Sequence, residues 1–417
     1  MQKVVLSRNT LAAALAIACT APSAFATEIN NFVSIYGFIN GQIESVEAKG
    51  GATPYERRGR ISDGNSRIGF TGNVEVNSDI KGIWQIEGGL NNFEQAGTND
   101  NGQTATLESR NTFVGLQSEK FGRFVIGNSD SVYRSLVGSG SALGGNLGMT
   151  VHGVDVFNNT SAQLTGNQDS IFSRGESRMK NSAHYLSPEL FGFQAGASYG
   201  FDEARASRSD RSRYSLALKY QYEGLAIGVG YDRQNNTGID STMLQRGYGV
   251  ILNAQEGLST SYAKAIISYT LPTKTTVGFG YERSSLGNSQ FINPSVGSIY
   301  TGNRDKTLKQ DAVILTLAQD YGDASFLFGY GKLNGLKGIN SFAEDDFQSK
   351  QLSLAATYKL NKFLTPYIYL TRINNNAQAS TNLGQSSLRS NNLGTSTAFF
   401  APGNSPRAIG VGLLARF

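Results

Sequence analysis

Residues 136–176 read LVGSGSALGGNLGMTVHGVDVFNNTSAQLTGNQDSIFSRGE, a stretch of 41 residues in which no strand or helix periodicity is sustained. It holds eight glycines, and its charged residues are Asp155, Asp169, Arg174 and Glu176. A structureless loop of this length in an ordered domain is functional, disordered or a sign of misassigned elements. Both flanks alternate like strands, over Arg123–Val132 and Arg178–Leu186. We therefore expect a wall of strands with residues 136–176 lying inside it.

Strand-like alternation recurs along the rest of the chain. Ile80–Leu90 places Trp84 and Ile86 on one face and polar residues on the other, whereas the faces of Phe32–Glu47 stay ambiguous. Short turns fall at residues 77–79, 120–122, 188–192, 222–224, 272–274, 322–323 and 361–362. Longer polar segments alternate with them, at residues 49–63, 91–108, 136–176, 202–210, 235–258, 285–307, 334–346 and 377–404. This pattern predicts about sixteen antiparallel strands of roughly ten residues each.

The composition favours an all-β membrane protein. Hydropathy is mildly negative and no run of roughly 20 apolar residues marks a membrane helix. A transmembrane barrel hides its apolar face in such an average, because lipid-facing and lumen-facing residues alternate. Aromatic residues such as Phe121, Phe191, Tyr222, Tyr321 and Phe363 cluster beside the short turns, as in a girdle at one membrane interface. We expect one domain, residues 27–417, that forms a closed barrel.

The first 26 residues form a secretory signal peptide. Lys3 and Arg8 give the positive start, Leu11–Ala18 the apolar core, and Ala24-Phe25-Ala26 the cleavage site. The alternative is a lipobox at Ala16–Cys19 that would leave a lipidated Cys19, but Ala16 matches poorly. Cleavage after Ala26 removes the single cysteine and leaves 35 basic against 32 acidic residues.

This composition excludes several classes of function. A mature chain without cysteine has no disulfide framework and no thiolate metal site. Two histidines, His152 and His184, leave little for zinc or histidine-based catalysis, so we expect no cofactor and no metal. The small net charge and the absence of a basic run argue against nucleic acid as a partner.

Several motifs resemble those of the Gram-negative porins, in the branch found in beta-proteobacteria and neighbouring groups. They are Ser66–Gly72 (SRIGFTG), Ile80–Glu87, Asn111–Leu116 (NTFVGL), Phe121–Gly127 (FGRFVIG), Asn181–Tyr185 with Ser187-Pro188, and Gly410–Phe417 (GVGLLARF). Each motif is weak alone, but their order and spacing extend over the whole mature chain.

The resemblance implies a sixteen-stranded outer-membrane barrel, usually a homotrimer, with short periplasmic turns and long extracellular loops. Ions and small polar solutes diffuse passively through such barrels, and the third long loop, here residues 136–176, folds into the lumen. It also implies that the C-terminal aromatic residue, here Phe417, is the signal recognised by the barrel-assembly machinery. Pairing of the last strand, Ala408–Phe417, with the first would leave no open edge in lipid.

The candidate site is the pore constriction. The family motifs place Arg67, Arg110 and Arg178 on an arginine ladder, and strand alternation independently points Arg67 inward. Lys81, Gln85 and Glu87 share a lumen-facing register, and Lys180 and His184 should follow Arg178 on the inward face. Asp130 and Asp155 are the acids expected to reach the pore, along with Asp169 and Glu176. We interpret His184 as a lumen-facing polar residue rather than a gate.

Two departures from the family pattern bear on selectivity. Gly127 is followed by Asn128, where a basic residue is often found. The loop offers Gly144-Gly145-Asn146 and a lone Asp155 in place of the acidic Pro-Glu-Phe-Gly-Gly segment of enterobacterial relatives. Wall cations facing few acids favour anions. We therefore expect a weakly anion-selective porin that is not an enzyme.

Three other functions stay open. A substrate-specific channel would carry an aromatic stair along the lumen, which the sequence does not reveal. An outer-membrane hydrolase would need a nucleophile, a base and an orienting group held together, and two isolated histidines do not suggest one. An adhesin or receptor would act through its long loops.

Overall fold

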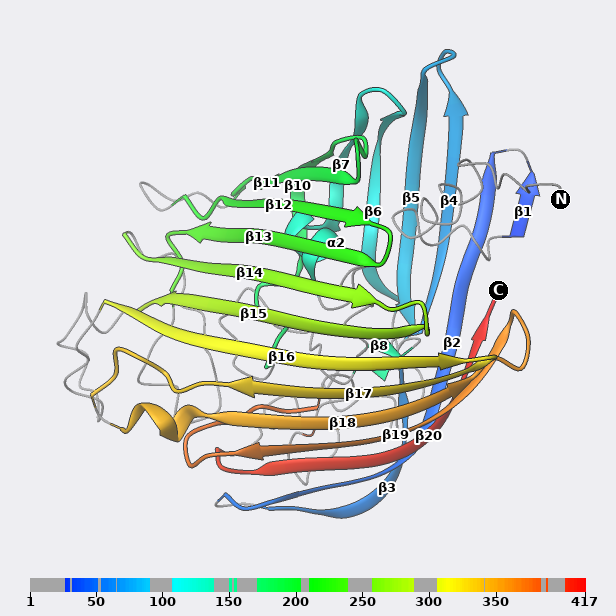
Figure 1. The fold of residues 1–417 in the computed structure, drawn as a ribbon. Coiled ribbons are helices and arrows are strands. Elements are labelled where there is room, and N and C mark those ends of the chain that lie inside the picture. Colours follow the sequence, from blue (N-terminus) through cyan, green and yellow to red (C-terminus); the bar gives the residue numbers. More distant parts are fainter. Residues whose placement is uncertain are drawn as a thin grey trace, which may run out of the picture.

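The computed structural model describes residues 27–30, 32–51, 54–64, 66–90, 107–138, 150–151, 154–155, 171–203, 210–238, 257–288, 306–340, 342–383, 388 and 402–417. Their main feature is one antiparallel sheet of eighteen strands, curved into a wall (Figure 1). The first strands are β1 (Thr27–Asn30), β2 (Val33–Lys49), β3 (Tyr55–Asp63), β4 (Arg67–Glu75), β5 (Ile80–Leu90), β6 (Leu107–Ser118) and β7 (Gly122–Asp130). The next are β10 (Arg178–Leu186), β11 (Phe193–Gly200), β12 (Arg213–Tyr222), β13 (Leu225–Asn235), β14 (Ser259–Thr270) and β15 (Thr275–Gly287). The last are β16 (Thr307–Tyr321), β17 (Ala324–Leu333), β18 (Ser349–Tyr358), β19 (Leu364–Asn375) and β20 (Ser405–Arg416).

The sheet closes on itself because β20 pairs with β2. Strands β3 and β4 share one position in the wall, since β3 pairs with residues 41–48 of β2 and β4 with residues 34–38. The short β1 pairs with residues 33–35 of β2, on the edge that β20 covers further along. Counted over the described residues, the wall therefore has sixteen strand positions, and the predicted closed antiparallel barrel is confirmed.

We call the β20–β2 pairing the seam of the barrel, and the last residue, Phe417, extends it by two backbone hydrogen bonds. The Gly37 amide donates to the Phe417 carbonyl at 3.1 Å, and the Phe417 amide donates to the Gly37 carbonyl at 3.1 Å. The Phe417 ring lies over Gly37, where an added Cβ would stand 2.7 Å from the ring. Pairing at this seam satisfies the edge of β2, which would otherwise face lipid with unpaired backbone groups.

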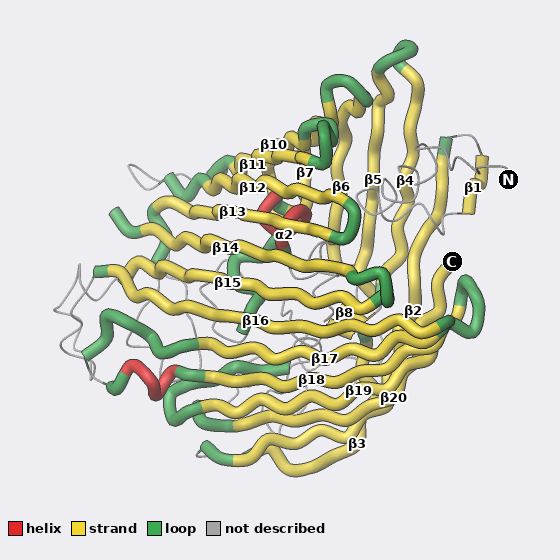
Figure 2. The backbone as a smooth tube through the Cα atoms, in the orientation of Figure 1, coloured by secondary structure: helices red, strands yellow, loops and turns green. Residues whose placement is uncertain are grey.

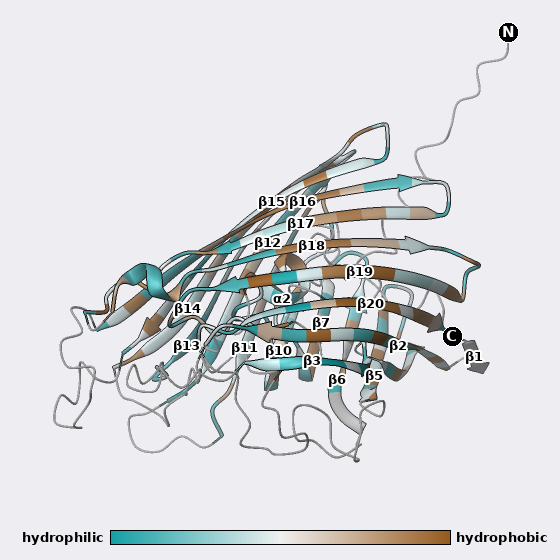
Figure 3. Cartoon of the chain, turned by 90° about the horizontal axis from the view of Figure 1, so that it is seen from below, coloured by the Kyte–Doolittle hydropathy of each residue, from teal (hydrophilic) through white to brown (hydrophobic). Residues whose placement is uncertain are grey.

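The two faces of the wall differ in polarity. In β18 the outward Leu352 and Leu354 are 41% and 44% exposed, whereas the inward Gln351 and Ser353 are buried. The same alternation settles the faces of β2, with Asn40 and Glu44 inward and buried and Ile43 outward and exposed. Figure 3 shows apolar and polar residues alternating along the strands. The outer face therefore matches a hydrocarbon environment and the inner face a polar one.

The described short turns lie at one rim of the wall, for example between β12 and β13 and between β16 and β17 (Figure 1). Exposed aromatic residues accompany them: Phe121, Phe191, Tyr222, Tyr321 and Phe363. Strands such as β13 and β14 meet the opposite rim on either side of a long connection, residues 236–258. This asymmetry follows the predicted pattern of turns and loops.

Helical structure among the described residues is limited to two short pieces, drawn in red in Figure 2. They are α2 (Val132–Val137) and the 3-10 turn η5 (Glu344–Phe347). Neither is long and apolar enough to cross a membrane. The strand expected to reach Val132 ends at Asp130, because Ser131 caps α2 by accepting a hydrogen bond from the Arg134 amide at 3.2 Å.

Candidate functional site

Helix α2 lies against the inner face of the wall. The Val132 amide donates to Ser198 Oγ on β11 at 3.0 Å, and the Tyr133 amide donates to Ser215 Oγ on β12 at 2.9 Å. These hydroxyls satisfy amides of the first helical turn, which have no partner within the helix. On β13, Gly230 leaves room for Val137, whose Cγ2 would stand 2.5 Å from an added Cβ. The chain leaving β7 is thus directed into the barrel.

The end of residues 136–176 also attaches to the inner wall. Arg174 Nη2 donates to Gln310 Oε1 on β16 at 2.8 Å, and its Nη1 donates to Ser284 Oγ on β15 at 3.3 Å. Arg213 Nη2 on β12 donates to the Gly175 carbonyl at 2.9 Å. Between the two attachments, the backbone pair β8 (Thr150–Val151) and β9 (Val154–Asp155) is described. Residues 139–149, 152–153 and 156–170, including His152 and Asp169, lie outside the described residues.

A buried cation, Lys264 on β14, holds this attachment together. Its Nζ forms an ion pair with Glu282 Oε2 at 2.9 Å, a second with Glu176, and a hydrogen bond to the Phe172 carbonyl at 3.2 Å. The same Nζ lies 4.5 Å from the Phe172 ring centroid and 5.3 Å from that of Tyr133. Burial, followed by the Glu282 and Glu176 carboxylates, raises the pKa of the Tyr133 phenol well above its usual range.

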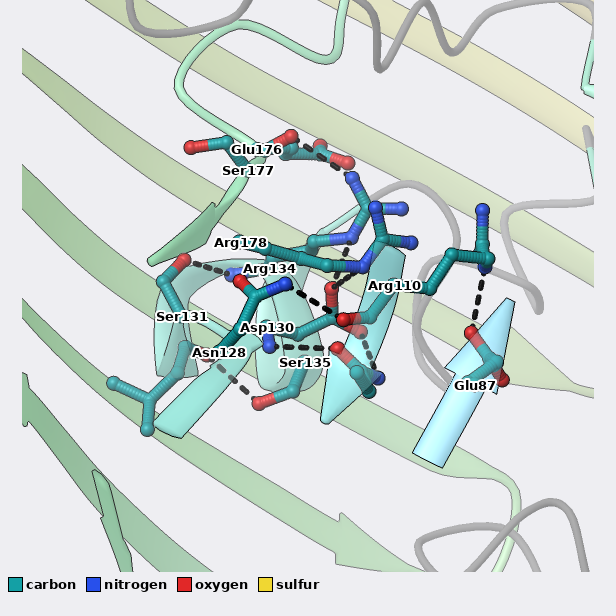
Figure 4. Close-up of polar contacts among 12 residues, drawn as sticks. Glu87, Arg110, Asn128, Asp130, Ser131, Arg134, Ser135, Glu176, Ser177 and Arg178 are labelled. Atoms are coloured by element: carbon teal, nitrogen blue, oxygen red, sulfur yellow. Dashed lines mark hydrogen bonds and ion pairs between the residues drawn. The ribbon is translucent and has the colours of Figure 1, made fainter. Parts of the chain in front are cut away.

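Arginines and carboxylates gather beside the start of α2 (Figure 4). Arg110 Nε on β6 lies 2.6 Å from Glu87 Oε1 on β5. Asp130 Oδ1 on β7 forms ion pairs with Arg134 Nε at 2.9 Å and with Arg178 Nε at 3.4 Å. We call this group, together with Arg67 on β4, the arginine cluster: Arg67, Arg110, Arg134, Arg178, Glu87 and Asp130.

A β-bulge brings neighbouring residues of β6 to the same side. The register between β5 and β6 shifts after the Ile86–Thr112 pair, so that Gly88 next faces Ser109. An inserted residue breaks the two-residue alternation and re-aims the side chains. Arg110 therefore reaches Glu87, while Asn111 Nδ2 donates to Asp130 Oδ2 at 3.1 Å.

The arginine cluster carries an excess of positive charge, with four guanidinium groups against two carboxylates. Arg67 stacks over Phe38, with its Cζ 4.7 Å from the ring centroid. Arg67 Nε and Arg178 Nη2 are buried and have no hydrogen-bond partner among the described residues. Such donors can act on an anion where little water screens them.

The remaining predicted residues fall at different places. Gln85 lies beside the cluster, donating to the Tyr36 hydroxyl at 2.7 Å, and that hydroxyl donates to Glu87 Oε2 at 2.9 Å. His184 is buried between Ser182 Oγ at 2.7 Å and Ser198 Oγ at 2.8 Å. Lys81 is exposed near the short-turn rim, away from the cluster. The structure describes the backbone of Asp155 as part of β9.

The alternation that linked Arg178, Lys180 and His184 is interrupted. The register between β7 and β10 shifts between Met179 and Ser182, and Asn181 adopts a φ of 47°. Consequently Lys180 is exposed while His184 is buried, so one inward face does not run through all three residues. Asn181 was the local sequence signal of this register shift, because asparagine tolerates the left-handed backbone region.

Arg134 is the cluster residue that sequence analysis missed. The expected strand through Val132 concealed it, because Asp130 and Arg134 are four residues apart, the spacing of a helical ion pair. Among the described residues, no three His, Cys, Asp or Glu side chains gather as a metal site would require.

A closed sixteen-position barrel with a polar interior and a segment attached inside it defines an outer-membrane β-barrel channel. Residues 12–378 match the family model described as Gram-negative porin, and the chain belongs to that family. It is therefore a porin of the Gram-negative outer membrane.

Curated relatives agree with this assignment. An outer membrane porin protein of Bordetella pertussis is 25% identical over 387 residues, which cover 85% of this chain and 92% of the relative. Major outer membrane protein P.IB of Neisseria gonorrhoeae is 25% identical over 339 residues, covering 79% and 85%.

Solved structures share the fold. An anion-selective porin from Comamonas acidovorans has a TM-score of 0.62 at 17% identity, covering 92% of this chain and 99% of that one. The trimer form of OmpT of Vibrio cholerae has a TM-score of 0.57 at 16% identity, with the same coverage.

Proposed function

We propose that this porin is a water-filled channel for passive diffusion of ions and small hydrophilic solutes, with a weak preference for anions. The observation that carries the proposal is the arginine cluster, in which four guanidinium groups face two carboxylates. Uncompensated charge at a narrow, poorly hydrated place raises the local concentration of counter-ions. The Comamonas acidovorans neighbour is described as anion-selective, which agrees with the proposal.

The same proposal assigns residues 136–176 to the constriction. Its support is that both described ends of this segment attach to the inner wall, through α2 and through Arg174 and Glu176. Of the predicted pore residues, Arg67, Glu87, Arg110, Asp130 and Arg178 then act at the constriction, with Arg134 added. Gln85 and His184 contribute as buried inward groups, whereas Lys81 and Lys180 act outside the cluster.

The experiment is single-channel recording across a salt gradient. We expect a reversal potential of the sign that anion preference gives, and Arg67→Gln combined with Arg178→Gln should shift it toward cations. A matched control is Lys359→Gln combined with Lys362→Gln, which removes two exposed charges at the short-turn rim. A cation-signed potential in the wild type, or an equal shift in both double variants, would overturn the assignment.

The alternative of a substrate-specific channel needs accessible inward aromatics. Tyr367 on β19 donates its hydroxyl to Asn40 Oδ1 at 2.7 Å, and Tyr369 donates to Glu44. Both rings are buried and held by the wall. This observation favours general diffusion, and flux that saturates for one solute class would favour the alternative.

Three further parts of the proposal concern maturation. We infer that residues 1–26 are cleaved as a signal peptide, that the mature chain forms a homotrimer, and that Phe417 marks it for the barrel-assembly machinery. N-terminal sequencing of the outer-membrane protein checks the first, and a mature chain beginning elsewhere than Thr27 would contradict it. Crosslinking in native membranes checks the second, with trimers expected and monomers alone contradicting it.

A further inference from the structure

Three tyrosines on the inner face of the wall share one arrangement. Each ring crosses a glycine of the neighbouring strand, and each hydroxyl reaches a polar side chain on the strand beyond. The three rows run from Tyr36 through Gly69 to Glu87, from Tyr367 through Gly412 to Gln42, and from Tyr369 through Gly410 to Glu44. All three rings are buried, and a Cβ added to the glycine of a row would overlap the ring of that row. The glycines therefore give the tyrosines a path across the intervening strand.

The row of Tyr36 ends on a carboxylate of the arginine cluster. The Tyr36 hydroxyl of β2 donates to Glu87 Oε2 at 2.9 Å, while Arg110 Nε of β6 donates to Glu87 Oε1 at 2.6 Å (Figure 4). Gln85 Nε2 donates to the Tyr36 hydroxyl at 2.7 Å, so that the hydroxyl proton is directed toward Glu87. Both carboxylate oxygens of Glu87 are thus occupied, one by a neutral donor and one by a cation.

A second cation of the cluster, Arg67, stands in the next row of the same strands. It faces Phe38 on β2 and Gly89 on β5, which places it diagonally beside Glu87. Diagonal neighbours in a sheet lie about 7–8 Å apart, within reach of a long side chain. The Arg67 guanidinium nevertheless stacks over Phe38, and its Nε has no hydrogen-bond partner among the described residues. A buried carboxylate and an unpaired cation therefore lie side by side without bonding.

We propose that Tyr36 is a positioning residue that determines the ion preference of the pore, because its hydroxyl keeps Glu87 from pairing with Arg67. This role rests on the proposed function, in which the cluster attracts anions. A buried carboxylate oxygen requires a donor, and a hydroxyl supplies a charge-assisted hydrogen bond without using a cation. Tyr36 therefore satisfies Glu87 and leaves the Arg67 guanidinium available to anions in the lumen.

The test is Tyr36→Phe in single-channel recording across a salt gradient. Phenylalanine keeps the ring over Gly69 and the net charge of the chain, but it leaves Glu87 Oε2 without its donor. Arg67 then takes the place of the hydroxyl. We expect the reversal potential to shift toward cations, by less than the shift that Arg67→Gln causes. In the Arg67→Gln background, Tyr36→Phe should add no further shift, because the competing cation is already absent.

Tyr367→Phe is the matched control, because it removes a buried hydroxyl from a row of the same kind. The Tyr367 hydroxyl donates to Asn40 Oδ1 at 2.7 Å and lies 3.1 Å from Gln42 Oε1. Both of these groups are neutral, and neither belongs to the arginine cluster. We expect Tyr367→Phe to leave the reversal potential at the wild-type value. Heat-modified electrophoretic mobility establishes that each variant is folded.

Three results would overturn the role of Tyr36: an unchanged reversal potential in Tyr36→Phe, an equal shift in Tyr36→Phe and Tyr367→Phe, or an undiminished Tyr36→Phe shift in the Arg67→Gln background. The wild-type potential reports separately on the proposed function. A cation-signed wild type would refute the anion preference, whereas the difference between wild type and Tyr36→Phe would still decide whether Tyr36 acts on the cluster.

Discussion

Glu87 shows how much of the arginine cluster depends on single contacts. Its carboxylate receives Arg110 Nε at 2.6 Å and the Tyr36 hydroxyl at 2.9 Å, and the side chains of Glu87 and Arg110 are each only 5% exposed. A buried ion pair contributes little over an apolar pair, but loss of one partner leaves the other charge uncompensated. Glu87 and Arg110 therefore act as a unit.

This coupling gives a prediction at the residue scale. We expect Arg110→Met to lower the free energy of unfolding by roughly 3 kcal/mol, because Glu87 then stays buried without the guanidinium group that donates to it. The double variant Arg110→Met with Glu87→Gln should recover part of that loss. Urea unfolding in lipid vesicles measures both values, and additive losses in the double variant would show that the two residues are not coupled.

Where the alternation is regular, the sequence alone predicted which side chains point inward. The inward positions of Arg67 on β4 and of Gln85 and Glu87 on β5 follow from a two-residue period. The sequence did not predict side-chain direction where a residue is inserted, as at Arg110 and Asn111. A bulge reverses the two-residue alternation, and no fixed sequence motif marks its position. Arg134 was missed for a related reason, since a helical turn interrupts the strand pattern.

At the element scale, the segment entering the barrel is held at both ends by polar contacts. The beginning is bonded through serine hydroxyls of β11 and β12, and the end through Lys264, Glu176 and Glu282. Glu176 and Lys264 are 88 residues apart. No local pattern could pair them, whereas β10 was predicted with its observed bounds, Arg178–Leu186, because its alternation is local.

Removing the cation should loosen this attachment. We expect Lys264→Met to increase open-channel current noise at least severalfold, because Glu176 and Glu282 are left as buried carboxylates without a counter-charge. Adding Glu176→Gln and Glu282→Gln to Lys264→Met should return the open-channel current noise toward the wild-type level. Lys359→Met at the short-turn rim is the control, and equal noise in wild type and Lys264→Met would show that Lys264 does not hold the segment.

At the scale of the whole molecule, closure depends on contact between Gly37 and Phe417. An added methyl group at Gly37 would stand 2.5 Å from the Arg67 carbonyl oxygen and 2.7 Å from the Phe417 ring. By contrast, nothing lies within 4 Å of the corresponding position at Gly59 on β3. The two glycines therefore provide a matched pair of substitutions.

We expect Gly37→Ala to lower the free energy of unfolding by about 1–3 kcal/mol through overpacking at the seam. Gly59→Ala should change it by less than about 0.5 kcal/mol. The loss of heat-resistant electrophoretic mobility with rising temperature compares the two variants. Equal behaviour would mean that the seam adapts to the methyl group.

The sequence predicted the architecture well because it is repeated: each strand adds the same alternation, and errors at one strand leave the others intact. It predicted the closing pair from the need to satisfy open edges rather than from any motif. The balance of charges at the cluster could not be counted from sequence, since it depends on which side chains the bulges at β6 and β10 turn inward.

The seam also fixes the order of events in folding. Gly37 and Phe417 are separated by 380 residues, whereas the other neighbouring strands of the wall follow one another in the chain, several of them joined by short turns. Bringing such distant residues together carries the largest loop-closure entropy of any pairing in the wall, and non-local pairing is slow. Hairpins can therefore form early. The backbone groups on one edge of β2 stay unpaired until β20 has folded. During that interval the chain is vulnerable to pairing with another molecule.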